Sequence, residues 1–135
     1  MLFASVHTDP TTYYPYFSGY ADERGEGEGL GANVNLPLAP GSGDDAFLEA
    51  CRTLVNAVRA HETEVLVVSA GWDAHRDDPL SLLDVSTDAF ARVGELLADL
   101  QLPTLIVQEG GYSLSAVSEA APRFVLAFRA SRPPR

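Results

Sequence analysis

The chain has 135 residues, a formal net charge of −10 and a single cysteine, Cys51. Its length fits one domain with a sizeable core. The acidic excess argues against a nucleic-acid-binding surface, which needs clustered Lys and Arg. No apolar run approaches the roughly 20 residues of a membrane span. A lone cysteine excludes an intramolecular disulfide and favours a reducing compartment, so the sequence predicts a cytoplasmic protein.

A long loop separates two short strands at the start of the chain. Residues 2–7 are an apolar run with Phe and Val that predicts a strand. The loop that follows extends to about residue 32, and loops of this length are usually either functional or disordered, of which the aromatic residues favour order. Its first half is aromatic with two prolines, and its second half is acidic and rich in glycine. Residues 33–38 alternate polar and apolar positions, which predicts a short edge strand.

Helices alternate with strands in the rest of the chain. Apolar residues at helical spacing predict three helices, over residues 45–60, from Ser86 or Thr87 to about residue 100, and over residues 115–130. Residues 65–70 and 104–108 are apolar runs, which predicts strands covered on both faces in a parallel sheet. This order indicates an α/β fold with right-handed crossovers.

The last two predicted strands each lead into a loop with candidate functional residues. In open α/β sheets ligands bind just beyond the carboxyl ends of the strands. Asp73, which follows the first of these strands, could hold a metal ion or could cap a turn. His75 could be a second metal ligand or a solvent-facing loop residue. Tyr112, after the second strand, could hydrogen-bond a developing oxyanion or be a packed aromatic with its hydroxyl at the surface.

Three other candidate motifs do not fit the chemistry that they suggest. Ser69 lacks the leading glycine of a nucleophile elbow. The run from Gly25 to Gly31 has no following Lys-Ser or Lys-Thr, and its glutamates would repel a phosphate. Cys51 lies on the apolar face of a predicted helix, so we interpret it as a core residue and not as a nucleophile.

Motifs along nearly the whole chain occur in the order found in one known family. The later ones are Val68-Ser69-Ala70-Gly71-Trp72-Asp73-Ala74-His75, Asp78-Pro79-Leu80 and Gln108-Glu109-Gly110-Gly111-Tyr112. The earlier ones are Ser5-Val6-His7-Thr8-Asp9-Pro10, Tyr13-Tyr14-Pro15-Tyr16-Phe17, Gly19-Tyr20-Ala21-Asp22-Glu23 and Gly29-Leu30-Gly31 to Asn35-Leu36-Pro37. Together they resemble the zinc-dependent histone deacetylase and acetylpolyamine amidohydrolase family, and most closely its acetylpolyamine branch.

The resemblance implies a fold and a set of catalytic roles. The fold would be the carboxyl-terminal part of the arginase/deacetylase three-layer α/β sandwich around a parallel sheet. Asp73 matches the last zinc ligand of the family. Tyr112 matches the tyrosine that polarises the scissile amide carbonyl and stabilises the oxyanion. Tyr14 matches an aromatic residue of the narrow channel for the acylated amine.

Four further positions match ion-binding or pocket residues of the family. Ser5 and Val6 match positions that help to hold a structural potassium ion, Val6 through its backbone carbonyl. Gly110 and Gly111 match the glycines of the pocket wall beside the tyrosine. The implied substrate is an acetylated amine, either an acetylpolyamine or an acetyl-lysine side chain. A homodimer is one option for the assembly, because a dimer narrows the active-site entrance in the acetylpolyamine branch.

The sequence departs from the family at its catalytic centre. The family carries an Asp-x-His motif with two more zinc ligands and a tandem histidine pair, both upstream of the Ser-Val-His strand, and this chain contains neither. We therefore expect residues 1–135 to be a partial deacetylase domain, inactive by itself, with a frayed tail over residues 131–135. The alternative is a non-catalytic α/β module, or pseudoenzyme, that folds alone or pairs with another chain.

Overall fold

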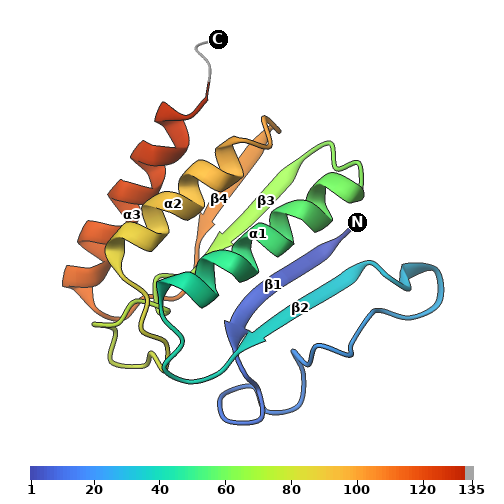
Figure 1. Cartoon of the computed structure of the whole chain (residues 1–135), viewed down its shortest axis with the longest axis horizontal. Helices are drawn as coiled ribbons and strands as arrows, with labels where there is room; N and C mark the ends of the chain where they lie inside the picture. Colours follow the sequence, from blue (N-terminus) through green and yellow to red (C-terminus); the bar gives the residue numbers. More distant parts are fainter. Residues whose placement is uncertain (133–135) are drawn as a thin grey trace.

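The computed structural model describes residues 1–132, which form four strands, three α-helices and one short 3-10 helix (Figure 1). In chain order these are β1 (Phe3–Thr8), η1 (Gly27–Gly29), β2 (Asn33–Leu38), α1 (Asp44–Ala60), β3 (Leu66–Ala70), α2 (Thr87–Ala98), β4 (Thr104–Gln108) and α3 (Leu114–Ala130). The predicted strands and α-helices are all present, with bounds shifted by at most about two residues. Within the described part of the chain, no helix has both the length and the apolarity to cross a membrane.

The strands form two separate parallel pairs. β1 pairs with β2 in a register that places Phe3 opposite Asn33, and β3 pairs with β4 with Leu66 opposite Thr104. The two pairs are not hydrogen-bonded to each other, so residues 1–132 contain two two-stranded sheets. All four strands point the same way in Figure 1. The prediction of an α/β fold with parallel strands is confirmed.

The core lies between the strands and the helices. Trp72 is at its centre and packs against Phe90 and Phe124, with ring centroids 5.6 Å away in both cases. Val68 and Ile106 pack against this cluster from β3 and β4. On the opposite face of these two strands, Val65, Val67 and Leu105 are 60%, 61% and 58% exposed. The prediction that these strands are covered on both faces is therefore wrong for the described residues, because the helices cover one face only.

Helix α3 packs through small and aromatic residues. Its buried positions are Ala116, Ala120, Phe124 and Phe128. Val125 lies outside this helical stripe and is 38% exposed. After the helix, Arg132 donates a hydrogen bond of 2.6 Å to the carbonyl oxygen of Leu102 and lies over the Phe128 ring. Ordered contacts thus continue to residue 132, and the rest of the tail that we expected to be frayed, residues 133–135, lies outside the described residues.

Polar side chains hold the long loop between β1 and β2. His7 donates from Nε2 to the carbonyl oxygen of Gly19 (2.8 Å) and accepts at Nδ1 from the Ser5 hydroxyl (2.8 Å). The Glu23 carboxylate accepts from the Gly19 N–H and from the side chain of the buried Asn35. These contacts tie the loop to both strands of the β1–β2 sheet.

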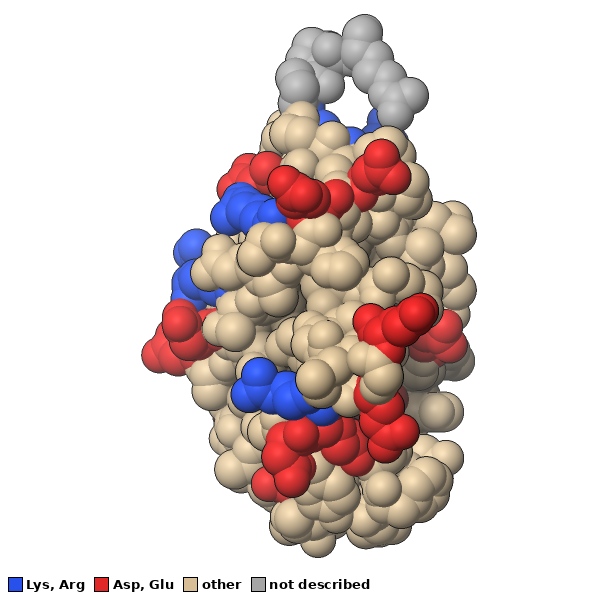
Figure 2. Space-filling view, turned by 90° about the vertical axis from the view of Figure 1, so that its right-hand side faces the viewer, with Lys and Arg blue, Asp and Glu red and all other residues tan. Residues whose placement is uncertain are grey.

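The surface carries more acidic than basic side chains, as the net charge of −10 requires. On the face drawn in Figure 2, the acidic residues form several groups along the length of the molecule, and uncharged surface separates them. The basic side chains on this face lie beside acidic ones and do not form a stripe. On this face, therefore, positive charge is not clustered.

Candidate functional site

The loops after β3 and β4 lie at the same edge of one sheet. The parallel register places Ala70 opposite Gln108, so both strands end at the same level. Just beyond, the backbone N–H of Trp72 donates to the carbonyl oxygen of Gly110 over 2.8 Å. The expectation that the two strands deliver their loops to one edge is therefore confirmed.

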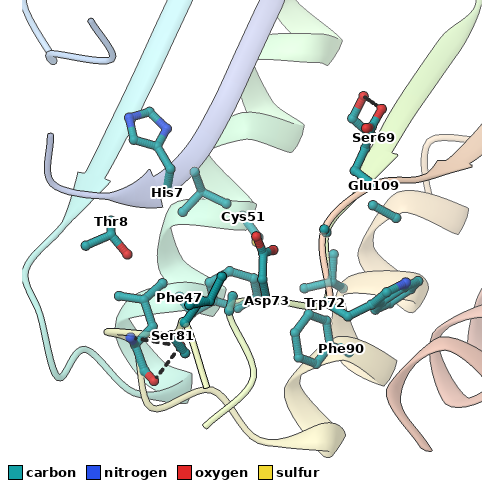
Figure 3. Close-up of a pocket in the computed structure, with 18 of the residues that line it drawn as sticks. His7, Thr8, Phe47, Cys51, Ser69, Trp72, Asp73, Ser81, Phe90 and Glu109 are labelled. Atoms are coloured by element: carbon teal, nitrogen blue, oxygen red, sulfur yellow. Dashed lines mark hydrogen bonds between the residues drawn. The ribbon is translucent and has the colours of Figure 1, made fainter. Parts of the chain in front are cut away.

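Two glycines enclose the Asp73 carboxylate. A Cβ atom on Gly71 would lie 2.6 Å from Asp73 Oδ1, and one on Gly110 would lie 2.6 Å from Asp73 Cγ. Both distances are shorter than real Cβ contacts, so these positions need glycine as long as Asp73 keeps its place. Burial raises the pKa of Asp73, and the negative charge of Asp78 raises it further. The carboxylate lines a cavity of about 460 Å³ (Figure 3).

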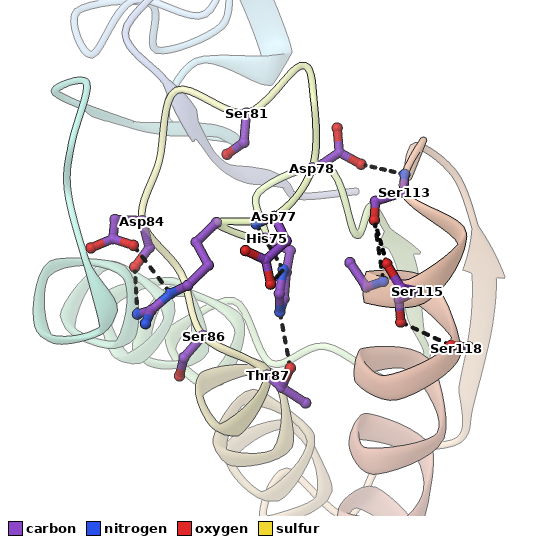
Figure 4. A network of polar contacts seen from close by, with 12 residues as sticks. His75, Asp77, Asp78, Ser81, Asp84, Ser86, Thr87, Ser113, Ser115 and Ser118 are labelled. Atoms are coloured by element: carbon purple, nitrogen blue, oxygen red, sulfur yellow. Dashed lines mark hydrogen bonds and ion pairs between the residues drawn. The ribbon is translucent and has the colours of Figure 1, made fainter.

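Asp78 holds the segment that carries Tyr112. Its Oδ2 accepts hydrogen bonds from the backbone N–H groups of Tyr112 (2.6 Å) and Ser113 (3.0 Å), and its Oδ1 accepts from Leu80 (3.0 Å) (Figure 4). Burial alone would raise the pKa of Asp78, but these three hydrogen bonds hold it below its usual value. The backbone of Tyr112 is thus fixed, whereas its side chain is 60% exposed.

His75 is buried and not solvent-facing. Its ring is 4% exposed and stacks on Phe90. Its Nδ1 accepts from the backbone N–H of Asp77 (3.1 Å), so Nε2 carries the proton and donates to the Thr87 hydroxyl (2.9 Å) (Figure 4). Both ring nitrogens are therefore engaged. In this arrangement His75 joins the Asp73 loop to the start of α2, and its role as a second metal ligand stays a prediction.

Aromatic residues of the long loop border the same cavity. Tyr13 and Tyr14 both line it. The Tyr13 hydroxyl donates to the carbonyl oxygen of Leu80 over 2.7 Å. The pKa of Tyr13 is raised, first by burial and then by the nearby Asp73 carboxylate. Tyr14, the predicted channel residue, is 73% exposed, so it stands at the rim.

The described residues do not form a complete zinc site. Among residues 1–132, no group of three or more His, Cys, Asp or Glu side chains is close enough together to hold a metal ion. His7 lines the cavity, but both of its ring nitrogens have partners. Cys51 lines it too, but burial raises the pKa of its thiol to about 12, so it stays protonated. Asp73 therefore has too few metal-ligating neighbours among residues 1–132 to hold zinc without ligands from elsewhere.

The remaining candidate positions are packed around this centre. Gly111 has a φ of +140°, and a Cβ there would lie 2.8 Å from Val117 Cγ2 and 3.1 Å from Trp72 Cβ. Gly110 lines the cavity, and Gly111 lies against the Trp72 side chain. The Ser5 hydroxyl is used by His7. No contact of Ser5 or Val6 bears on potassium binding, so that role stays a prediction.

Two residues of the site are not singled out by the sequence. Tyr13 is indistinguishable there from its aromatic neighbours, because the tyrosines and the phenylalanine between residues 13 and 17 share one pattern. Asp78 has the local pattern of an Asp-Pro turn. A signal is present in both cases, since both residues belong to the motifs that carry the family resemblance.

Comparison with known proteins gives the site its context. A family model described as "Histone deacetylase domain" matches residues 1–128. The chain is 47% identical over 132 residues to an acetylpolyamine amidohydrolase of Burkholderia pseudomallei, and this match covers 98% of the chain and 39% of the relative. It is 46% identical over 117 residues to acetylpolyamine amidohydrolase 1 of Pseudomonas aeruginosa, and this match covers 87% of the chain and 34% of that protein. The chain thus spans little more than a third of the length of these curated relatives.

Solved structures agree with the sequence relatives. The crystal structure of the acetylpolyamine aminohydrolase from Burkholderia pseudomallei superposes with a TM-score of 0.95 at 47% identity, over 98% of this chain and 39% of that one. The HDA15 HD domain superposes with a TM-score of 0.89 at 32% identity and the same coverage. These matches confirm the predicted arginase/deacetylase fold, of which the described residues form part. The chain belongs to the histone deacetylase domain family.

Proposed function

We propose that this chain is the part of a zinc-dependent amidohydrolase that supplies one metal ligand and the oxyanion-stabilising tyrosine. The complete domain would remove the acetyl group from an acetylated amine. The observation that carries this proposal is the Asp73 carboxylate, which Gly71 and Gly110 enclose at the edge shared by β3 and β4. A carboxylate held so tightly beside a cavity is a suitable oxygen ligand for a divalent metal.

Each residue at this edge has a distinct role in the proposal. When bound, zinc would supply Lewis-acid activation of water and of the amide carbonyl. Asp73 would hold the metal, and the Tyr112 hydroxyl would hydrogen-bond the oxyanion that develops on the carbonyl oxygen. Asp78 would keep Tyr112 in place through its backbone N–H. Gly110 and Gly111 would form the wall of the pocket.

The relatives and the net charge support a proposal for the substrate class. Two similar proteins, 47% and 46% identical, are named acetylpolyamine amidohydrolases. An acidic protein with a net charge of −10 attracts cations, which suits a polyamine. Exposed aromatic rings at the rim, such as Tyr14, could contact a methylene chain. We therefore propose acetylpolyamines as substrates ahead of acetyl-lysine side chains. A structural potassium ion at Ser5 and Val6 belongs to the same proposal.

The domain boundaries follow from the incomplete site. We propose that residues 1–135 are one portion of a deacetylase domain, and that the other zinc ligands and the general base come from the rest of it. The non-catalytic module remains the second candidate function. It is favoured by one observation, namely that residues 1–132 hold no cluster of three metal-ligating side chains.

A chimera tests the proposal. Residues 1–128 of this chain would replace the matched segment of the Burkholderia pseudomallei relative, and zinc content and acetate release from an acetylated diamine would be measured. We expect about one zinc per chain and deacetylation. Asp73→Ala should lose both, because it removes a ligand. Tyr112→Phe should keep zinc and lower the rate by roughly a hundredfold or more, as for other lost oxyanion donors.

Asp77→Asn is the matched control, because Asp77 lies in the same loop but its side chain is 72% exposed. This variant should keep both zinc and activity. An Asp73→Ala chimera that bound zinc as well as the parent chimera would exclude Asp73 as a ligand. A parent chimera that folded without deacetylating any acetylated amine would favour the non-catalytic module.

A further inference from the structure

The long loop between β1 and β2 is hydrogen-bonded to the Asp73 loop through one side chain. The Tyr13 hydroxyl donates to the carbonyl oxygen of Leu80 over 2.7 Å. Among residues 1–132, this is the sole hydrogen bond from the long loop, residues 9–32, to any residue after β2. The other hydrogen bonds of the loop stay within it or go to β1 and β2. The position of the loop relative to the Asp73 loop therefore depends on this hydroxyl.

Both partners of this hydrogen bond are anchored. The backbone N–H of Tyr13 donates to the carbonyl oxygen of Asp9 (3.1 Å), and the N–H of Asp9 donates to Leu38 of β2 (2.8 Å). On the other side, the N–H of Leu80 donates to Asp78 Oδ1 (3.0 Å). Because each segment has its own fixed partner, the Tyr13 hydroxyl fixes one segment relative to the other.

The contacts continue from Leu80 to Tyr112. The Asp78 carboxylate accepts from Leu80 at one oxygen and from the backbone N–H of Tyr112 at the other, over 2.6 Å. Four groups are thus connected in series, namely the Tyr13 hydroxyl, the Leu80 backbone, the Asp78 carboxylate and the Tyr112 backbone. We call this series the Tyr13–Tyr112 link. It joins three segments that lie far apart in the sequence, and it ends at the candidate oxyanion-stabilising residue.

The surroundings of Tyr13 suit this arrangement. Tyr13 and Leu80 line the cavity of about 460 Å³ together with Asp73. Burial raises the pKa of Tyr13, and the charges of Asp73 and Asp78 raise it further. The hydroxyl therefore keeps its proton at neutral pH, as a hydrogen-bond donor must.

We infer that Tyr13 is a positioning residue, whose hydroxyl holds Leu80 and, through the Asp78 carboxylate, the backbone of Tyr112. The inference rests on the proposed function, because the reaction is what Tyr112 would serve. A group that stabilises the transition state raises the rate only while it is held in the right place. Loss of the Tyr13 hydroxyl should therefore lower the rate of the chemical step without removing any group that contacts the metal or the oxyanion.

A purely structural role for Tyr13 makes a different prediction. If the hydroxyl only held the long loop, its loss would loosen the loop and leave the Tyr112 backbone unchanged. If the Tyr13–Tyr112 link operates, the same loss also loosens Leu80 and Tyr112. Tyr13→Phe separates the two cases, because it removes the hydroxyl and keeps the ring that lines the cavity.

Amide hydrogen exchange of the whole chain, measured by NMR, tests the link. In Tyr13→Phe the N–H groups of Leu80 and Tyr112 should exchange at least about threefold faster, as expected for the loss of one hydrogen bond that supports them. The N–H of Leu66, which is bonded within the β3–β4 sheet, should not change. Asp78→Asn weakens the middle of the link, so in that background Tyr13→Phe should have little further effect on Tyr112.

Kinetics of the chimera described above test the consequence for the reaction. Tyr13→Phe should keep about one zinc per chain and lower kcat by about three- to tenfold, with KM within about twofold of the parent, because Tyr112 would act in the transition state. Tyr16→Phe is the matched control. Tyr16 lies in the same loop, is 60% exposed, and its hydroxyl has no hydrogen bond within the described part of the chain. This control should change neither the exchange rates nor kcat.

Three results would overturn the inference. They are an unchanged exchange rate at Tyr112, an equal acceleration of all amides with a lower urea midpoint, and a rise in KM at unchanged kcat. The two proposals fail in different ways. An active parent chimera whose kcat was insensitive to Tyr13→Phe would keep the proposed function and exclude the positioning role. A folded but inactive parent chimera would count against the proposed function, whereas faster exchange at Tyr112 would still establish the Tyr13–Tyr112 link.

Discussion

Asp73 is a residue at which stability and function conflict. Burial and the charge of Asp78 raise its pKa, so the ionised carboxylate destabilises the chain. This penalty is present above the raised pKa and disappears as the pH falls towards the ordinary value. Asp73→Asn should therefore raise the urea midpoint of the isolated chain at pH 7, and the gain should shrink towards pH 3. A lower midpoint at pH 7 would show that the carboxylate contributes contacts that outweigh its burial.

Asp78 has the opposite pH dependence. Its pKa is held down by three backbone N–H groups, so its contribution to stability is complete above the unfolded pKa of about 3.9 and is lost as the pH falls through the lower folded value. Asp78→Asn should destabilise the chain by about 1.5–3 kcal/mol at pH 7, the range for hydrogen bonds to charged groups. Urea titrations of parent and variant should converge towards pH 2. A constant difference across this range would mean that the charge of Asp78 is irrelevant.

Sequence patterns identify site residues only where the signal is local. Asp73 can be predicted because it follows a buried strand and a glycine within three residues. The role of Asp78 cannot, because the two N–H groups on β4's loop that it binds are 34 and 35 residues away in the chain. The interpretation of His75 as a solvent-facing loop residue is wrong for the same reason, because the residue is 4% exposed and its partner Thr87 is 12 residues away in the chain. Spacing in the sequence does not encode such contacts.

Among the helices, the contact between α2 and α3 depends on Gly94. A Cβ on this residue would clash with the carbonyl oxygen of Phe124 and would lie 3.2 Å from the N atom of Phe128. Because both partners are backbone atoms, they cannot rotate away. Overpacking should cost Gly94→Ala about 3 kcal/mol, the upper end of the usual range, because both contacts are backbone atoms, and this exceeds the gain of about 1 kcal/mol in helix propensity.

Gly29→Ala is the control for this prediction. A Cβ on Gly29 would have no other atom within 4 Å, and the residue has no positive φ, so its substitution should change the free energy of unfolding by less than about 0.5 kcal/mol. Urea denaturation measures both variants. Equal stability of Gly94→Ala and the parent would mean that α2 and α3 separate easily, and that their contact is not part of the rigid core.

The sequence predicts the positions of helices and strands better than it predicts what covers their faces. The apolar periodicity of residues 45–60 and the Val-rich run at residues 65–70 locate α1 and β3 to within about a residue. The same run suggests two covered faces, yet Val67 is 61% exposed. A strand's composition reflects what covers it in the complete fold. The apolar outer face of β3 and β4 therefore supports the proposal that residues 1–135 are one portion of a larger domain.

At the scale of the whole molecule, one helix joins the two sheets. β1 and β3 share no hydrogen bonds, and α1 contributes Leu54 to the cavity that both strands line and Phe47, Leu48 and Cys51 to the core. The stability of the whole chain therefore depends on the packing of α1. Cys51 provides a chemical reporter for this packing, because it is the only cysteine in the sequence and is 6% exposed.

Thiol labelling at pH 8 should follow global unfolding. Burial raises the pKa of Cys51 to about 12, which leaves roughly one thiolate in ten thousand at that pH, whereas an unfolded thiol with a pKa of about 8.5 is partly ionised. Cys51 should therefore react at least about a thousandfold more slowly in the native chain than in 8 M urea. Fast labelling of the native chain would mean that α1 opens locally, and that the two sheets do not unfold as one unit.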